Sequence, residues 1–115
     1  GVAFKPDSDD VRDSPALDIA AALHLMGAKV VVHDPKANRN AARSFPTLTY
    51  ADSWQEAVTG ADLTMLLTEW REFRQLDPVA TSDLVAAPLM FDGRNALEPA
   101  AWRAAGWTYQ GIGIP

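Results

Sequence analysis

The chain of 115 residues contains no cysteine. This absence excludes a thiol nucleophile, a disulfide framework and a cysteine-based zinc site within these residues. The two histidines, His24 and His33, have no partners at metal-ligand spacing. The sequence therefore predicts no metal site.

Long apolar runs and basic residues are also scarce. A membrane-spanning helix needs about 20 predominantly apolar residues, and no segment approaches that length. The first ten residues lack the layout of a signal peptide, so we expect a cytoplasmic protein or a part of one. The formal net charge of −5 makes nucleic acid a poor partner, although a few local cations still suffice to hold a nucleotide.

A glycine-rich phosphate loop is missing as well. A nicotinamide-binding unit carries G-x-G-x-x-G between its first strand and helix, whereas residues 1–10 here read GVAFKPDSDD. Asp34 follows the second predicted strand, where a ribose-binding acid would stand. Without the glycines we interpret Asp34-Pro35 as a turn, and we expect no NAD binding by this chain alone.

What is present is an alternation of short apolar strands and capped helices. Helices are predicted to begin at Ser14-Pro15, at the capping box Ser53–Glu56, at Asp77-Pro78 and at Glu98-Pro99, with a further short helix over 38–44. Strands are predicted over 29–33, 48–50, 63–67, 89–91 and 107–110, and residues 1–4 are interpreted as the tail of a truncated first strand. This order predicts an α/β fold, a Rossmann-like three-layer domain with a mostly parallel sheet.

Ligands of such sheets bind at the carboxyl ends of the strands. Three predicted ends carry chemistry: Phe4-Lys5, residues 68–70, and the Asp92-Gly93 turn before Arg94. Lysine can reach a phosphate as a point charge, and arginine can grip one with two hydrogen bonds. The residues alone favour surface ion pairs for Lys5 and Arg12, and they leave Arg94 open between a ligand contact and a turn-stabilising role.

Aromatic side chains follow the strand at 63–67. Trp70 and Phe73 stand three positions apart among charged residues. This spacing favours a short helix whose aromatic rings pack inward while the charges face water.

The longest motif resembles a known family. Residues 1–17 read GVAFKPDSDDVRDSPAL and resemble the GLAFKPNTDDVRESPAL segment of UDP-glucose and GDP-mannose dehydrogenases. Further segments agree in order: Asp34-Pro35, LTEWREF at 67–73, FDGRN at 91–95 and GWTYQGIG at 106–113. The resemblance covers essentially the whole chain, 1–115, and is specific for the carboxy-terminal UDP-binding domain of the UDP-glucose 6-dehydrogenase family.

The resemblance implies a function that this chain performs only in part. The family oxidises the sugar C6 alcohol to a carboxylate with two hydride transfers to NAD. An amino-terminal domain binds NAD, and a catalytic cysteine lies between the two domains; neither is present here. By motif position, Phe4, Lys5 and Arg94 contact the nucleotide sugar, and Arg12 reaches toward NAD. The expected partners are UDP-glucose, the amino-terminal domain and, in the full-length enzyme, a second subunit.

Other functions stay open at this stage. The chain is also compatible with the same domain of a UDP-N-acetylmannosamine or GDP-mannose dehydrogenase. A non-catalytic nucleotide-binding module is a second alternative. A structural or dimer-forming domain is a third, served by an exposed patch of tryptophans at positions 54, 70, 102 and 107.

Overall fold

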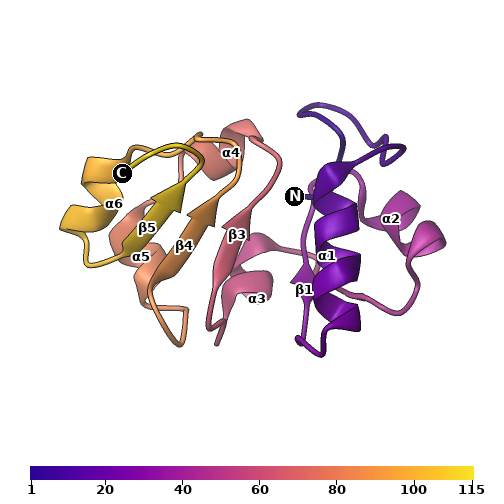
Figure 1. Ribbon diagram of the computed structural model, residues 1–115, viewed down its shortest axis with the longest axis horizontal. Helices are drawn as coiled ribbons and strands as arrows, with labels where there is room; N and C mark the ends of the chain where they lie inside the picture. Colours follow the sequence, from indigo (N-terminus) through magenta and orange to yellow (C-terminus); the bar gives the residue numbers. More distant parts are fainter. The chain divides into compact units, whose positions relative to one another are not determined.

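The computed structural model describes all residues from Gly1 to Pro115. They form two compact units, Gly1–Ala57 and Val58–Pro115, which are described one by one (Figure 1). No helix in either unit has the length and apolar character that crossing a membrane requires.

The first unit contains two short parallel strands and two helices. Strands β1 (Val31–Val32) and β2 (Thr49–Tyr50) pair in parallel. Helix α1 (Pro15–Leu25) precedes β1, and α2 (Asn38–Ser44) connects the two strands. The predicted strand over 29–33 shrinks to two paired residues, whereas the predicted helix over 38–44 is confirmed.

Helix α1 begins as its sequence predicts. The hydroxyl of Ser14 accepts a hydrogen bond from the backbone N–H of Leu17 at 3.2 Å, and Gly27, with φ +98°, follows the helix end. The apolar face is buried only in its first half, at Ala16, Leu17 and Ala20. Leu25, at helical spacing from these residues, is 86% exposed and lies in the last turn beside exposed Met26.

Residues 1–4 show no strand pairing, unlike the strand tail predicted for them. Val2 and Ala3 are nevertheless buried. Their backbone N–H groups donate to the carboxylate of Asp34, each at 2.9 Å. The Asp34 side chain therefore accepts the hydrogen bonds that the carbonyl groups of a neighbouring strand would otherwise accept.

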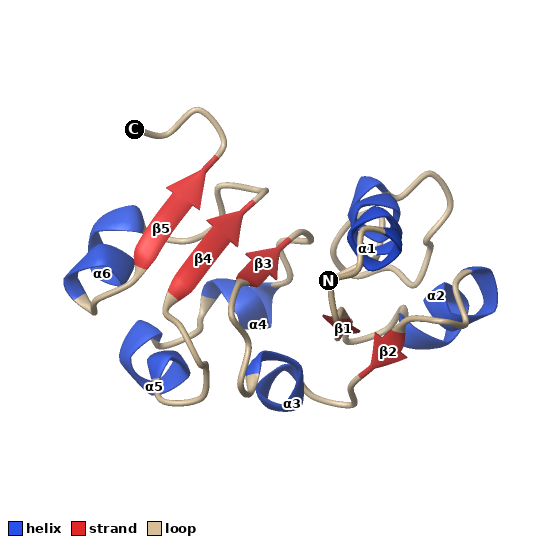
Figure 2. Ribbon diagram, turned by 60° about the horizontal axis from the view of Figure 1, so that its bottom comes forward, coloured by secondary structure: helices blue, strands red, loops and turns tan.

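The second unit is built on three parallel strands. Strands β3 (Thr64–Leu66), β4 (Leu89–Asp92) and β5 (Thr108–Gly111) stand in the order β3-β4-β5. Their arrows run side by side in one direction in Figure 2. Since every paired strand of both units is parallel, the predicted α/β class with a parallel sheet is confirmed.

Short helices accompany these strands. Helix α3 (Trp54–Val58), which belongs to the first unit except for its last residue, precedes β3 and is capped as predicted by Ser53, whose hydroxyl accepts from Glu56 N at 3.2 Å. Helices α4 (Arg71–Arg74) and α5 (Pro78–Ser82) lie between β3 and β4, and α6 (Pro99–Ala104) packs on β5. Helix α5 stops well before Pro88 because the following segment bonds elsewhere: Leu84 O accepts from Gly60 N, and Ala86 N donates to Ala61 O.

The core of the second unit lies on one face of the sheet. Because side chains alternate along a strand, Leu66, Met90 and Tyr109 point to the same side, and all are buried. Trp102 and Trp107 meet edge to face there, with ring centroids 4.9 Å apart. Trp70 and Phe73 are each 5% exposed, so their predicted inward packing is confirmed. With three of four tryptophans buried, the exposed tryptophan patch is wrong.

Candidate functional site

The first candidate loop runs from Phe4 to Asp10. The backbone N–H of Phe4 donates to Asp10 O at 2.7 Å and closes the loop. Asn40 of α2 donates from its side chain to Asp9 O at 2.9 Å and anchors it. Phe4 is 46% exposed and Lys5 is also exposed. The loop therefore presents an aromatic and a cationic side chain from a fastened backbone.

A buried aspartate, Asp34, binds the backbone just before this loop. Asp34 is 2% exposed, and its Oδ2 accepts from Val2 N and Ala3 N, just before Phe4. Its Oδ1 accepts from Lys36 N and Ala37 N at 3.0 and 2.9 Å, which forms the predicted turn. Burial acts to raise the pKa of Asp34, but the backbone donors together hold that pKa below its usual value. A carboxylate engaged in this way is a structural group and not a ribose ligand.

Arg12 forms the ion pair that the residues alone favoured. Its Nη2 lies 2.9 Å from Asp10 Oδ2, and its Nε donates to Asp10 Oδ1 at 3.0 Å. The side-chain hydrogen bond from Arg12 is the main cause that lowers the pKa of Asp10 to about 2. The same contact raises the pKa of Arg12. The side chain of Arg12 remains 87% exposed, so the pair orients the guanidinium without burying it.

The second candidate loop follows β4 and contains Arg94. The guanidinium Nε donates to Leu67 O at 2.8 Å, just beyond the end of β3. Its Nη1 lies 3.6 Å from Glu69 Oε2, and both side chains are 30% exposed. Arg94 thus lies at the carboxyl ends of β3 and β4 and combines a turn-stabilising contact with a half-buried positive charge.

Asp92 is the last residue of β4 and the centre of this loop. It is fully buried, and its Oδ1 accepts from Arg94 N at 3.1 Å. Its Oδ2 accepts from Ala96 N and Leu97 N, both at 2.8 Å, and from the Tyr109 hydroxyl at 2.7 Å. Burial, followed by the hydrogen bond to Asp92, raises the pKa of Tyr109. The sequence predicted a turn at Asp92-Gly93, and it gave no signal of the bond from Tyr109 to Asp92.

Asn95 fastens the same loop to the chain after β5. Its Oδ1 accepts from Ile112 N and its Nδ2 donates to Ile112 O, both at 2.8 Å. Its backbone has φ +52°, a conformation that asparagine tolerates better than most residues. A side chain at Gly111 would place Cβ 2.5 Å from Asn95 Oδ1, so this contact requires a glycine there. No sequence signal pointed to this pairing.

Comparison with known proteins identifies the family of the chain that carries these loops. The family model described as UDP-glucose/GDP-mannose dehydrogenase family, UDP binding domain, matches residues 1–99. The chain belongs to this family. The predicted resemblance is confirmed, and both candidate loops lie within the matched part of the UDP-binding domain.

Individual relatives agree with the family match. A UDP-glucose 6-dehydrogenase of Pseudomonas aeruginosa is 44% identical, over 100% of this chain and 27% of the relative. One of Bacillus subtilis is 38% identical, over 98% of this chain and 26% of the relative. The chain therefore spans about a quarter of the length of the curated relatives that it matches.

Solved structures show the same fold. An NDP-N-acetyl-D-galactosaminuronic acid dehydrogenase from Methanosarcina mazei superposes with a TM-score of 0.85 at 32% identity, covering 98% of this chain and 23% of the other. A UDP-glucose dehydrogenase from Pyrobaculum islandicum superposes with a TM-score of 0.79 at 29% identity, covering 100% of this chain and 24% of the other. These similarities confirm the Rossmann-like α/β architecture of the UDP-binding domain.

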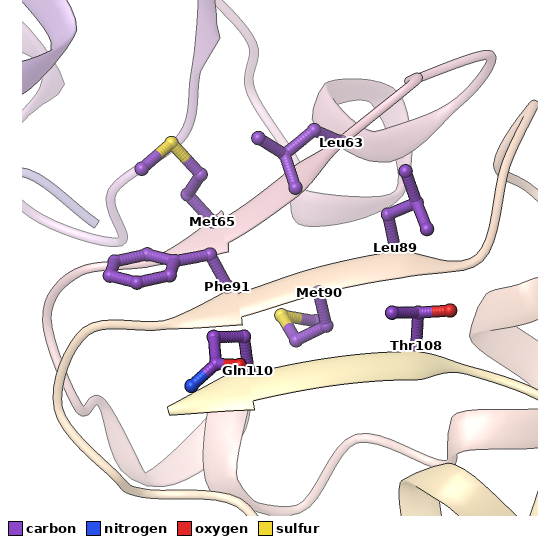
Figure 3. A pocket seen from close by; sticks show the side chains of 7 residues that line it. All are labelled: Leu63, Met65, Leu89, Met90, Phe91, Thr108 and Gln110. Atoms are coloured by element: carbon purple, nitrogen blue, oxygen red, sulfur yellow. The ribbon is translucent and has the colours of Figure 1, made fainter. Parts of the chain in front are cut away.

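One depression of the UDP-binding domain is not suited to a nucleotide. It lies on the sheet face opposite the core of the second unit, and Figure 3 shows the seven side chains that line it. The shared register of the strands brings Met65, Phe91 and Gln110 to this face. Its lining holds no charged residue, so it offers nothing to a diphosphate, in contrast to the loops that carry Lys5 and Arg94.

Proposed function

We propose that this chain is the nucleotide-sugar-binding domain of a UDP-glucose 6-dehydrogenase and that it binds UDP-glucose. One observation carries the proposal: the UDP-binding-domain match over residues 1–99 includes both cation-bearing loops. Identity to UDP-glucose 6-dehydrogenases across the whole chain supports the choice of sugar.

Each candidate residue has a distinct role in this proposal. Lys5 supplies an exposed point charge to a phosphate or a sugar hydroxyl. Arg94 presents a half-buried planar guanidinium, whose geometry suits a phosphate with two hydrogen bonds. Phe4 offers an exposed aromatic ring to the nucleotide sugar beside Lys5. All three follow from the resemblance, and the exposure of Phe4 and Lys5 and the place of Arg94 at the ends of β3 and β4 support it.

The complete reaction needs residues that this chain does not contain. We propose that the parent enzyme oxidises UDP-glucose to UDP-glucuronate in the cytoplasm as a homodimer, with NAD bound mainly by its amino-terminal domain. The resemblance places the catalytic cysteine in the region between the domains, and this chain itself contains no cysteine. The contribution of Arg12 is a contact toward NAD, and the isolated chain is expected to be inactive.

The proposal is tested by calorimetric titration of the chain with UDP-glucose. Lys5→Ala and Arg94→Ala should each weaken binding about tenfold or more, because each removes a charge-assisted hydrogen bond worth about 1.5–3 kcal/mol. Lys29→Ala and Arg39→Ala are matched controls, since both residues are exposed and lie outside the two loops. Unchanged affinity in both Lys5→Ala and Arg94→Ala would show that the assignment is wrong.

A second candidate is the same domain of a dehydrogenase for an N-acetylated nucleotide sugar. The structural similarity to the Methanosarcina mazei enzyme favours this candidate, because that protein is named for an N-acetylated sugar acid. A panel of UDP-glucose, UDP-N-acetylmannosamine and GDP-mannose with the full-length enzyme separates the candidates. A stand-alone module without catalysis would bind a nucleotide sugar and show no NAD reduction in the full-length protein.

A further inference from the structure

The loop that carries Arg94 is organised around a single carboxylate. Three backbone N–H groups, of Arg94, Ala96 and Leu97, and one hydroxyl, of Tyr109, donate to Asp92 within 2.7–3.1 Å. The loop backbone therefore wraps around a buried anion. Since the backbone of Arg94 is itself one of the donors, Asp92 determines where the arginine side chain leaves the main chain.

Asp92 acts on any ligand only through its neighbours. Its exposed fraction is 0%, so it cannot touch a ligand at the surface of the domain. The guanidinium of Arg94 is held at its far end by Leu67 O and Glu69. The near end is held by Asp92. Two fixed points, one at each end, limit the directions in which this long side chain can extend.

Resting on the proposed function, we propose that Asp92 is a positioning residue, oriented by the Tyr109 hydroxyl, that directs the Arg94 guanidinium toward the diphosphate of the nucleotide sugar. Tyr109 lies on β5, next to β4 in the sheet. Its short hydrogen bond to Asp92 Oδ2 fixes the rotation of the carboxylate group, and this rotation decides whether Oδ1 faces Arg94 N.

The sequence contains a matched control for this bond. Tyr50, the other of the two tyrosines, donates a hydrogen bond from its hydroxyl to Phe45 O at 2.9 Å in the first unit. Tyr50→Phe and Tyr109→Phe each remove one hydroxyl and one intramolecular hydrogen bond. Only the second removes a bond to Asp92. A purely structural role would therefore make the two variants equivalent in ligand affinity.

The experiment measures the dissociation constant of UDP by calorimetry for the 115-residue chain, together with its unfolding in urea. We expect Tyr109→Phe to weaken UDP binding about three- to tenfold, which corresponds to the loss of one net hydrogen bond. Binding is measured without urea, where the variant is folded. Tyr50→Phe should keep the wild-type dissociation constant. In an Arg94→Ala background, Tyr109→Phe should have no further effect, because the positioning acts through Arg94.

The outcomes separate this inference from the proposed function. If Arg94→Ala weakens UDP binding and Tyr109→Phe does not, the inference is wrong while the function stands. If Tyr109→Phe still weakens binding without Arg94, Asp92 does not act through that arginine and the inference is also wrong. Absence of UDP binding by the wild-type chain overturns both. Should Tyr109→Phe fail to fold, Asp92→Asn is judged by the same criteria, since an amide offers one acceptor oxygen in place of two.

Discussion

The carboxylate of Asp34 accepts a hydrogen bond of 2.9 Å from the backbone N–H of Ala3, one residue before Phe4. This contact joins the end of β1 to the segment that leads into the first candidate loop. In the second unit, Asp92 has the same place at the end of β4 and bonds to the backbone of Arg94. In both units, a buried carboxylate after a strand holds the backbone next to a predicted ligand contact.

Replacing Asp34 by alanine should destabilise the chain strongly. The substitution leaves four backbone N–H groups in a buried region without their acceptor. We expect the free energy of unfolding to fall by about 3 kcal/mol, measured by urea denaturation. Asp52→Ala, at an exposed position, should change it by less than about 0.5 kcal/mol. A similar small change for Asp34→Ala would contradict the role assigned to this carboxylate.

The stability of the chain should fall in acid. The pKa of Asp34 is below its usual value, and that of Asp10 is lowered from 3.8 to about 2. A carboxylate with a lowered folded-state pKa stabilises the fold fully above its unfolded-state pKa. This stabilisation is lost as the pH falls from about 4 through the folded-state values. Urea denaturation between pH 7 and pH 3 should show the decline, and Asp34→Asn should flatten it. An unchanged slope in that variant would assign the decline to other groups.

Arg12 should affect NAD and not the nucleotide sugar. Its ion pair with Asp10 leaves the guanidinium exposed, and the resemblance places it toward the cofactor. We expect Arg12→Ala to change the UDP-glucose affinity of the chain by no more than about twofold. The surface ion pair that it removes contributes little to the stability of the fold, so the residues that contact the sugar nucleotide should stay in place. In the full-length enzyme the same substitution should raise KM for NAD. A loss of UDP-glucose affinity as large as that of Lys5→Ala would place Arg12 in the sugar site.

Asn95 should be replaceable by glycine at less cost than by alanine. Both substitutions remove the two hydrogen bonds to Ile112, but only glycine adopts φ +52° without strain. We expect Asn95→Ala to be less stable than Asn95→Gly by about 1 kcal/mol. Thermal or urea unfolding measures this difference. Equal stability of the two variants would show that the positive φ carries no strain in this loop.

The short elements of this chain were predicted where the signal is local. The cap at Ser14 and the capping box at Ser53 both lie where the structure has them. A cap needs only residues within about four positions. The extents of the strands were less predictable, since the run at 29–33 pairs only through Val31 and Val32. Pairing depends on partners far along the chain.

For the candidate site too, local motifs were predictable from the sequence and contacts between distant residues were not. The motifs predicted Phe4, Lys5, Arg12 and Arg94 as site residues, because each lies within a segment that resembles the family. They did not show that Asp34 bonds to Val2 and Ala3, which lie 32 and 31 residues away. They also did not show that Tyr109 bonds to Asp92, at a separation of 17 residues.

The sequence by itself determined the family of this protein, its parallel α/β class and the place of Arg94 at a strand end. Only the tertiary structure decided that Asp34 and Asp92 are buried residues that hold the backbone next to them. The physical reason is that a buried carboxylate persists only where donors surround it. Those donors come from segments that come together only when the chain folds, so no local sequence pattern predicts them.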